Sequence, residues 1–523
     1  KFMAGFQTEY MKQTAFGLQN EGILIPGLPQ VDLTSGLDNA GKAVTPSVNG
    51  SRAEWNTAGF FGRINYDYDG KYLVEANFRY DGTSRFRRDN RWIALPSVSL
   101  GWNVARESFW ESLSDKINTL KLRASWGLLG NQNTTNWYQT YRTIGFTASN
   151  GSWLQNGVKP NVSSFPALVS TALTWEKIEN YNIGLDFGMF DNRLTGSFDW
   201  YIRNTLDMVG NAPELPAVLG ASVPLTNNTD LRTTGWDFEI SWKDRLNNGL
   251  GYNVKFTLSD SRTKITSYPN NPTKSLSSYI EGEYLNQIYG YQTIGIAKTD
   301  EEMQAHLAKV NQDNLGSNWG AGDIMYADLD GDGKITWGDW TLDNHGDEKV
   351  IGNSTPRFHF SLDLGADWKG FDVRVFFQGV MKRDYAPASG YFYGADNNFW
   401  WSMGLTPHVD YFRNDPNHPL GLNLDSYYAR PTFSTSKNNQ NQTHYLQDAS
   451  YIRLKNLQIG YTIPKSVVSK WGISNLRVYV SGENLWTGTS LSELFDPETI
   501  DGGWNGCVYP MSRTLSCGLS LTF

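Results

Sequence analysis

The chain has 523 residues, with 45 Lys and Arg against 53 Asp and Glu, and its net charge of −8 argues against a nucleic-acid-binding surface. Its mean hydropathy is −0.47, and no run approaches the ~18 apolar residues of a membrane-spanning helix, which excludes a helical membrane protein. Aromatic residues make up 14% of the chain and glycine contributes 51 residues. Such a composition is typical of a β-barrel with a water-filled lumen and aromatic girdles.

Alternation of apolar and polar residues predicts strands along the whole chain. A first strand is expected within residues 1–15, and a hairpin follows over 64–80, where Asp69-Gly70 is a typical two-residue turn. The later alternating stretches are 98–104, 120–128, 181–189, 194–202, 236–242, 252–258, 358–364, 371–377, 457–463, 476–480 and 515–523. The pattern therefore predicts about fourteen antiparallel strands.

The expected connections alternate between short and long. Short links lie near residues 69, 110, 191, 247, 369 and 468. The long ones cover 16–56, 83–93, 130–173, 204–230, 263–356, 381–448 and 486–511. Short turns at one end and long loops at the other are typical of transmembrane barrels, and expected strands of roughly 10–12 residues suit a tilted membrane span. The alternative is a soluble sandwich or propeller, whose strands are usually shorter and whose loops are not separated by length.

The last strand ends on an aromatic residue. Leu519, Leu521 and Phe523 share one face, after Gly518. This ending resembles the closing strand of bacterial outer-membrane barrels, and the resemblance implies that these four residues are the signal read by the barrel-assembly machinery. Cys517 falls on the same face, and a disulfide between it and Cys507 is left open.

Several motifs closely resemble the SusC-like TonB-dependent transporters of Bacteroidetes outer membranes. They occur in family order at Tyr72–Phe86, Pro96–Trp102, Ile288–Tyr291, Asp328–Ile335, Tyr451–Leu457 and Val478–Leu485. The family pattern has a plug domain and a barrel of 22 strands, whereas we recognise no plug and no signal peptide here. The chain 1–523 is therefore expected to be the carboxyl-terminal part of a transporter barrel, with the other strands and the plug upstream or in another chain. A complete fourteen-stranded barrel is the structural alternative.

The resemblance implies TonB-dependent import of a nutrient, such as an oligosaccharide or a peptide, across the outer membrane. Its implied partners are a SusD-like surface lipoprotein, the TonB–ExbB–ExbD complex acting through the plug, and outer-membrane lipid. A structural or adhesive barrel and a passive porin are the rival interpretations. No residue arrangement indicates an active site, so we do not expect an enzyme.

The long connection 263–356 contains a loop of the EF-hand calcium-binding type at 328–339. The expected ligands are Asp328, Asp330, Asp332, Lys334 through its carbonyl group, Thr336 and Asp339. Asp339 departs from the usual Glu at the last position, which weakens the pattern. The sequence predicts a structural Ca²⁺ ion, and the simpler interpretation is a solvated turn.

A second long connection, 381–448, is rich in aromatic residues. Aromatic rings beside amide groups could stack on and hydrogen-bond a sugar or peptide. The candidate substrate-binding residues are Tyr391, Tyr393, Asn397, Asn398, Trp400 and Trp401. An interface with a surface lipoprotein and simple loop packing are the competing interpretations.

Overall fold

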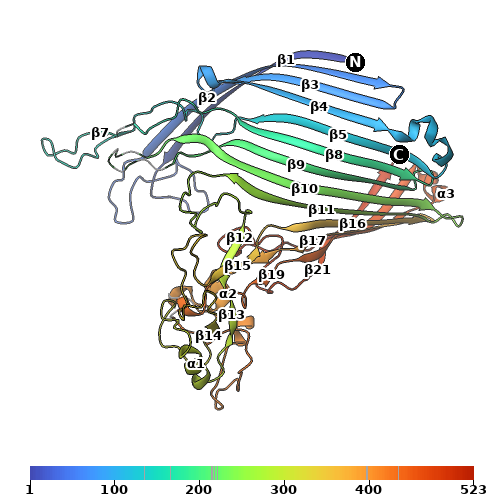
Figure 1. The fold of residues 1–523 in the computed structure, drawn as a ribbon. Coiled ribbons are helices and arrows are strands. Elements are labelled where there is room, and N and C mark those ends of the chain that lie inside the picture. Colours follow the sequence, from blue (N-terminus) through green and yellow to red (C-terminus); the bar gives the residue numbers. More distant parts are fainter. Residues whose placement is uncertain are drawn as a thin grey trace.

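The computed structural model describes residues 1–134, 136–164, 166–213, 216, 218, 220, 222–395, 399–433 and 435–523. One antiparallel sheet of fourteen strands dominates it, and the strands follow one another around the sheet in chain order (Figure 1). The strands are β1 (Phe2–Gln19), β2 (Ser47–Tyr68), β3 (Tyr72–Thr83), β4 (Trp92–Asn103), β5 (Ile117–Asn131), β8 (Glu176–Met189), β9 (Leu194–Asn211), β10 (Leu225–Arg245), β11 (Gly251–Ser267), β16 (Arg357–Trp368), β17 (Phe371–Lys382), β20 (Tyr451–Thr462), β21 (Asn475–Thr489) and β22 (Thr514–Thr522). The predicted all-β fold and strand number are confirmed.

The sheet curves into a wall. In Figure 1 the strands β8 to β11 lie nearest the viewer, while β21 and the other strands near the carboxyl terminus lie behind them, so the convex face is in view. Strands β1 and β22 form the two edges of this sheet. Among the described residues, no helix is both long enough and apolar enough to pass through a bilayer.

Period-two alternation gives the wall two different faces. Along β9, Phe198, Trp200 and Ile202 lie on one face and Asp199 on the other, and the direct pairs Phe198–Phe238 and Trp200–Trp236 continue the aromatic face onto β10. The short turns follow the expected chemistry. Asp69 and Gly70 both have positive φ values, of 54° and 61°, as a tight hairpin turn requires.

Several strands are longer than the predicted 10–12 residues. Strands β2 and β10 have 22 and 21 residues, and β1 and β9 have 18 each. The predicted loops 16–56 and 204–230 are therefore wrong in their bounds, because the connections cover only 20–46 and 212–224. Likewise β11 continues to Ser267, so its long connection begins at residue 268. Backbone pairing needs only a neighbouring strand, and it continues where polar residues on both faces remove the alternation signal.

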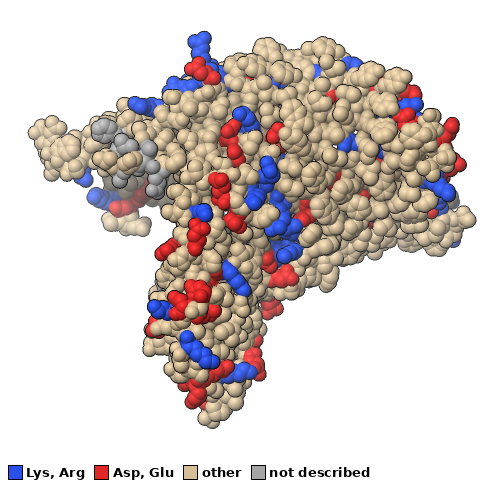
Figure 2. Space-filling view, in the orientation of Figure 1, with Lys and Arg blue, Asp and Glu red and all other residues tan. Residues whose placement is uncertain are grey.

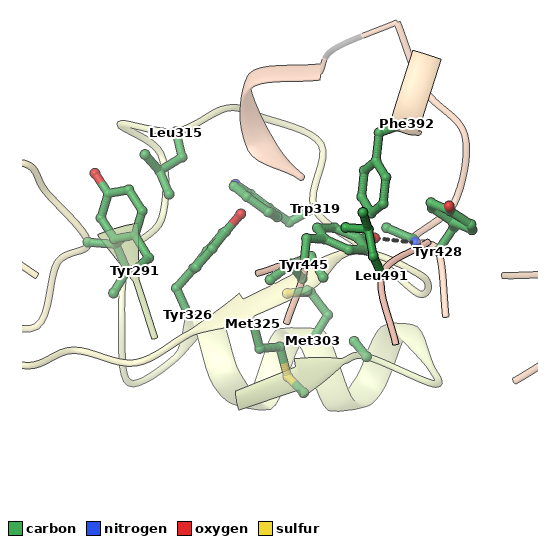
Figure 3. Packing of buried hydrophobic residues seen from close by; sticks show 14 of the residues in the cluster. Tyr291, Met303, Leu315, Trp319, Met325, Tyr326, Phe392, Tyr428, Tyr445 and Leu491 are labelled. Atoms are coloured by element: carbon green, nitrogen blue, oxygen red, sulfur yellow. Dashed lines mark hydrogen bonds between the residues drawn. The ribbon is translucent and has the colours of Figure 1, made fainter. Parts of the chain in front are cut away.

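Three long connections fold together into a lobe, defined here as residues 268–356, 383–450 and 490–513, which projects from the long-loop end of the wall (Figure 1). Its core is unusually aromatic (Figure 3). Tyr291 and Tyr326 from the first connection meet with ring centroids 5.4 Å apart. Phe392 and Tyr445 come from the second, and Leu491 from the third. These loops are therefore held by a common core rather than extending separately into solvent.

Short elements brace the lobe. Strand β12 (Gln287–Tyr291) pairs with β15 (Glu348–Asn353), and β13 (Thr293–Ile296) pairs with β14 (Ile324–Tyr326). Helix α1 (Asp300–Leu307) begins after Thr299, whose side chain accepts the Glu302 N–H as an N-terminal cap. The first and last parts of the 268–356 connection are thus tied to each other by backbone pairing.

Candidate functional site

The concave face of the wall is polar and carries an ion-pair network across three strands. Arg123 of β5 lies 2.8 Å from carboxylate oxygens of both Asp186 on β8 and Asp199 on β9. A cavity of about 660 Å³ adjoins it and is lined by Asn65, Glu75, Ser99, Lys121, Ser125 and Asn182 among others. These side chains suit a water-filled passage and offer hydrogen bonds to a polar molecule.

A glycine makes room for this network. A Cβ atom at Gly184 would lie 2.5 Å from Asp199 Oδ1 and 2.7 Å from Arg123 Cζ. Both distances are too short for van der Waals contact, so a side chain opposite Arg123 in the β5–β8 register would require the ends of the Asp199 and Arg123 side chains to move.

The lobe is fastened by a buried carboxylate. Asp323, whose side chain is fully buried, accepts hydrogen bonds from Arg430, Lys437 and Asn438. Burial alone would raise the pKa of Asp323, but the hydrogen bonds from Arg430, Asn438 and Lys437 outweigh it and hold that pKa below its usual value. The ionised group therefore joins the first connection to the second.

An apolar groove of about 720 Å³ lies on the lobe. Its lining includes Tyr393, Met403, Leu405, Tyr411, Tyr428 and Phe433. Aromatic and aliphatic walls of this size can hold an organic ligand or an apolar side chain of a partner protein. Met403, Leu405 and Phe433 were absent from the residues predicted from sequence, because isolated apolar residues in a loop give no periodic signal.

The four described residues of the predicted substrate-binding set, Tyr391, Tyr393, Trp400 and Trp401, occupy different environments. The Tyr391 hydroxyl donates to the Leu494 carbonyl group at 3.1 Å, and the Tyr393 hydroxyl donates to the Pro387 carbonyl group at 3.0 Å. Burial raises the pKa of Tyr393 well above its usual value, so this hydroxyl stays protonated. Of the four described residues in this prediction, Tyr393 is the one found in the groove lining, and it also packs in the lobe core.

The predicted tryptophans lie at the surface. Trp400 is 86% exposed and Trp401 54% exposed. Trp401 packs against Trp504 of the third connection, with ring centroids 5.6 Å apart. Asn397 and Asn398 lie outside the described residues. The described aromatic side chains thus divide between the lobe core and its surface.

Three of the predicted calcium ligands come together. Asp328, Asp330 and Asp332 place one carboxylate oxygen each within 4.8 Å of one another. The same carboxylates accept backbone N–H groups, from Gly331 and Gly333 to Asp328, from Asp332 to Asp330 and from Lys334 to Asp332. These bonds fold the loop so that its acidic side chains converge.

Thr336 and Asp339, at the later positions of the loop, form hydrogen bonds with other parts of the lobe. Asp339 is not part of the carboxylate group, and its Oδ2 accepts the Asn344 side-chain amide at 2.8 Å. The Thr336 hydroxyl accepts the Gly338 N–H, and the Thr336 N–H donates to Asp347 at 2.8 Å. Asp347 also accepts the Leu329 N–H at 2.6 Å, so this buried carboxylate closes the base of the loop from outside the motif.

The chain matches the family described as "TonB dependent receptor-like, beta-barrel" over residues 6–485. It is 29% identical to TonB-dependent receptor P3 of Formosa agariphila over 520 residues, which cover 92% of this chain and 47% of that protein. It is 26% identical to TonB-dependent receptor SusC of Bacteroides thetaiotaomicron, with 89% of this chain and 43% of that protein covered. The chain therefore spans about half the length of these relatives.

A solved structure of the RagAB peptide transporter has the same fold. Its TM-score to this chain is 0.76 at 23% sequence identity, and the match covers 100% of this chain and 53% of that one. A structure of the RagAB importer in its open-open state gives a TM-score of 0.75 at 22% identity. The likeness at this level of identity concerns the fold.

Proposed function

The chain belongs to the TonB-dependent receptor-like β-barrel family and is an outer-membrane protein, and from this we propose that it forms the barrel wall of an importer for a large nutrient, an oligosaccharide or a peptide. The family is one of transporters rather than enzymes. The observation that carries the proposal is the pairing of an aromatic convex face with a polar concave face on the same strands. Such a wall separates lipid from an aqueous passage.

We propose that a SusD-like surface lipoprotein works with this wall. The lobe supports this proposal because it offers a preformed surface at the long-loop end, with an apolar groove and an exposed tryptophan. Aromatic side chains on a rigid support are typical of protein–protein contact sites. In the SusC-like pattern that the sequence resembles, TonB, ExbB and ExbD deliver energy to the plug.

An uptake experiment separates active import from its rivals. Cells that lack the protein and cells in which it is restored are supplied with labelled oligosaccharide or peptide mixtures, with and without a protonophore. Active import predicts accumulation that needs the protein and stops when the proton-motive force is removed. Accumulation that continues with the protonophore would indicate a passive porin, and unchanged uptake on deletion would indicate a structural or adhesive barrel.

We also propose that the 328–339 loop binds Ca²⁺ as a structural ion of the lobe. Three carboxylates within 4.8 Å of one another support this, because hard oxygen ligands suit a divalent cation and repel one another without one. The ion would be held by Asp328, Asp330 and Asp332, and would supply positive charge to a loop that lies against the buried Asp347.

A further inference from the structure

The convex face of β10 and β11 carries three basic side chains at its long-loop end. In the antiparallel register Arg232 lies directly opposite Lys264, and Thr234 lies opposite Arg262. Trp236 and Phe238 follow Arg232 on the same face of β10, since alternate residues share a face. All three basic residues are exposed. Figure 2 shows Lys and Arg, interspersed with Asp and Glu, on the wall next to the root of the lobe, beside a broad area with few charges.

Among the described residues, these cations contact uncharged groups rather than acidic ones. Arg232 donates from Nε to the Asn204 side-chain carbonyl group at 2.9 Å, and the Arg262 guanidinium lies over the Tyr284 ring at 3.8 Å. Within the part of the chain that the structure describes, none of Arg232, Arg262 and Lys264 forms an ion pair. The cluster therefore keeps its positive charge.

The carboxylates close to these residues in the strand register are already hydrogen-bonded. Asp230, two residues before Arg232 on β10, accepts the Asp207 N–H through Oδ1 at 2.8 Å. Asp260 lies two residues before Arg262 on the same face of β11. Its carboxylate accepts hydrogen bonds from both Nε and Nη2 of Arg357. Glu179 on β8 accepts hydrogen bonds from Trp126, Tyr181 and Asn204. In the described part of the chain, none of these three carboxylates is hydrogen-bonded to Arg232, Arg262 or Lys264, so the three basic side chains are open to an external anion.

Two physical arguments indicate what this anion is. Like charges directly opposite each other on neighbouring strands destabilise a sheet, so Arg232 and Lys264 gain from a shared anion. The position of these residues along the membrane normal also indicates what the anion is. Arg232 lies four residues beyond Trp236, roughly 14 Å along the strand, and Trp side chains of a barrel lie at the membrane–water interface. With a strand tilt of ~45°, this distance is a rise of about 10 Å, which puts the cluster on the headgroup side of the interface.

A cavity adjoins one member of the cluster, Arg262, whereas Arg232 and Lys264 are not among its lining residues. It has a volume of about 370 Å³ and is lined by Arg262, Arg357 and Lys382, with Asp384 as its acidic residue. The Asp384 Oδ2 accepts the Asn353 N–H at 2.8 Å and so is already hydrogen-bonded. A phosphate oxygen is well matched to such guanidinium and ammonium donors.

We propose that Arg232, Arg262 and Lys264 bind the phosphate group of an outer-membrane lipid headgroup, and that this contact fixes the height of the wall in the outer leaflet where the lobe begins. The site is independent of the imported nutrient, because it lies on the convex face. It follows from outer-membrane location and does not depend on transport.

The test uses the protein purified in detergent from outer membranes and compares three probes: diphosphoryl lipid A, the same glycolipid without its phosphates, and inorganic phosphate. The variant is R232Q/R262Q/K264Q. Its matched control is K116Q/K465Q/K470Q, which removes three exposed charges at the short-turn end. Folding of each variant is checked by heat-modifiable migration on gels, and R232Q/K264Q replaces the triple variant if that one fails to fold.

We expect the wild type and the control to bind diphosphoryl lipid A, and the R232Q/R262Q/K264Q variant to bind it about a hundredfold more weakly, since each basic side chain near an anionic surface contributes roughly a factor of five. The double variant should lose roughly 25-fold. Equal binding by variant and wild type would overturn the proposal, as would equal binding of the phosphate-free glycolipid. Inorganic phosphate binding as tightly as the lipid would also overturn it, and so would loss of a protein partner with lipid binding unchanged.

Discussion

Arg430 and Asp323 join two loops of the lobe through a two-point contact. Arg430 donates from Nε to Oδ1 at 2.8 Å and from Nη2 to Oδ2 at 2.6 Å, across 107 residues of chain. Lys437 adds an Nζ contact of 2.9 Å to the same carboxylate. One fully buried acid thus holds two basic side chains of the second connection against the first.

Replacing this acid should loosen the lobe. Asp323→Asn keeps the shape of the side chain but leaves Lys437, itself only 3% exposed, without its counter-charge. Removing one partner of a buried charge pair is strongly destabilising, so we expect a loss of about 3 kcal/mol in the stability of the lobe. The measurement is the rate of limited proteolysis between residues 268 and 450 in detergent.

The matched control is Asp343→Asn. Asp343 is paired with Lys274 at 3.2 Å in the same lobe, but its carboxylate is 73% exposed. An exposed pair contributes less than about 1 kcal/mol, so this variant should be cleaved at nearly the wild-type rate. Equal rates for both variants would show that the Asp323 contacts do not hold the loops together.

The same carboxylate predicts a dependence on pH. Because the pKa of Asp323 is lower in the folded lobe than in an unfolded chain, its stabilising contribution is fully present above the unfolded pKa, near ~3.9, and is lost as the pH falls through the folded pKa. The stability of the lobe should therefore decrease below about pH 4, and Asp323→Asn should flatten that decrease. Urea titrations at several acidic pH values, followed by near-ultraviolet circular dichroism, measure it. Parallel curves for the variant and the wild type would exclude Asp323 as the responsible group.

The strand pattern could be predicted from sequence because each strand separates lipid from water. Phe198 and Trp200 face the lipid and Asp199 faces the lumen. Apolar and polar residues therefore have to alternate along the strand, and this alternation can be recognised in the sequence. The extensions of β9 and β10 beyond the membrane carry no such constraint. Their ends pair through the backbone near Leu225 and Asn211, and a backbone ladder leaves no pattern in residue types.

The candidate sites show the same limit. The Asp328–Asp332 cluster lies within a few residues of chain, so its convergence could be predicted from spacing. The contribution of Asp347 could not be predicted, because its hydrogen bond from the Leu329 N–H depends on how the whole connection folds. Tyr393 was predicted as a substrate-binding residue, and that remains a prediction. Its packing with Tyr445 in a common aromatic core could not be predicted from local sequence, because it depends on how distant connections fold together.

Gly184 offers a test of the polar wall. Gly184→Ala would place a Cβ atom 2.5 Å from Asp199 Oδ1 and 2.7 Å from Arg123 Cζ, so the ion-pair network has to shift. The atoms that have to move are the ends of flexible, partly exposed side chains, so we expect a cost of about 1 kcal/mol, the lower end of the range for overpacking. We expect heat-modifiable migration on gels to report unfolding at a lower temperature for this variant.

Gly62→Ala is the control for Gly184→Ala. Gly62 also lies within a strand, β2, but its nearest neighbour to an added Cβ atom is the Met3 carbonyl oxygen at 3.7 Å, an ordinary contact. It should unfold at nearly the wild-type temperature. A Gly184→Ala barrel as stable as the Gly62→Ala barrel would mean that the Arg123 network can shift without cost.

The proposed Ca²⁺ ion should make the lobe sensitive to chelators. An ion present at 100 times its Kd stabilises the folded state by about 2.7 kcal/mol, which for a region of this size corresponds to a Tm change on the order of 5–10 °C. We expect a chelator to lower the melting temperature of the wild-type lobe, and D328A/D330A to melt at the lower temperature with or without it.

Asp339→Ala is the control. The Asp339 carboxylate bonds to Asn344 and lies outside the cluster, so this variant should keep the response of the wild type to the chelator. Wild-type melting curves that are unchanged by the chelator would mean that the backbone N–H groups alone balance the three carboxylates.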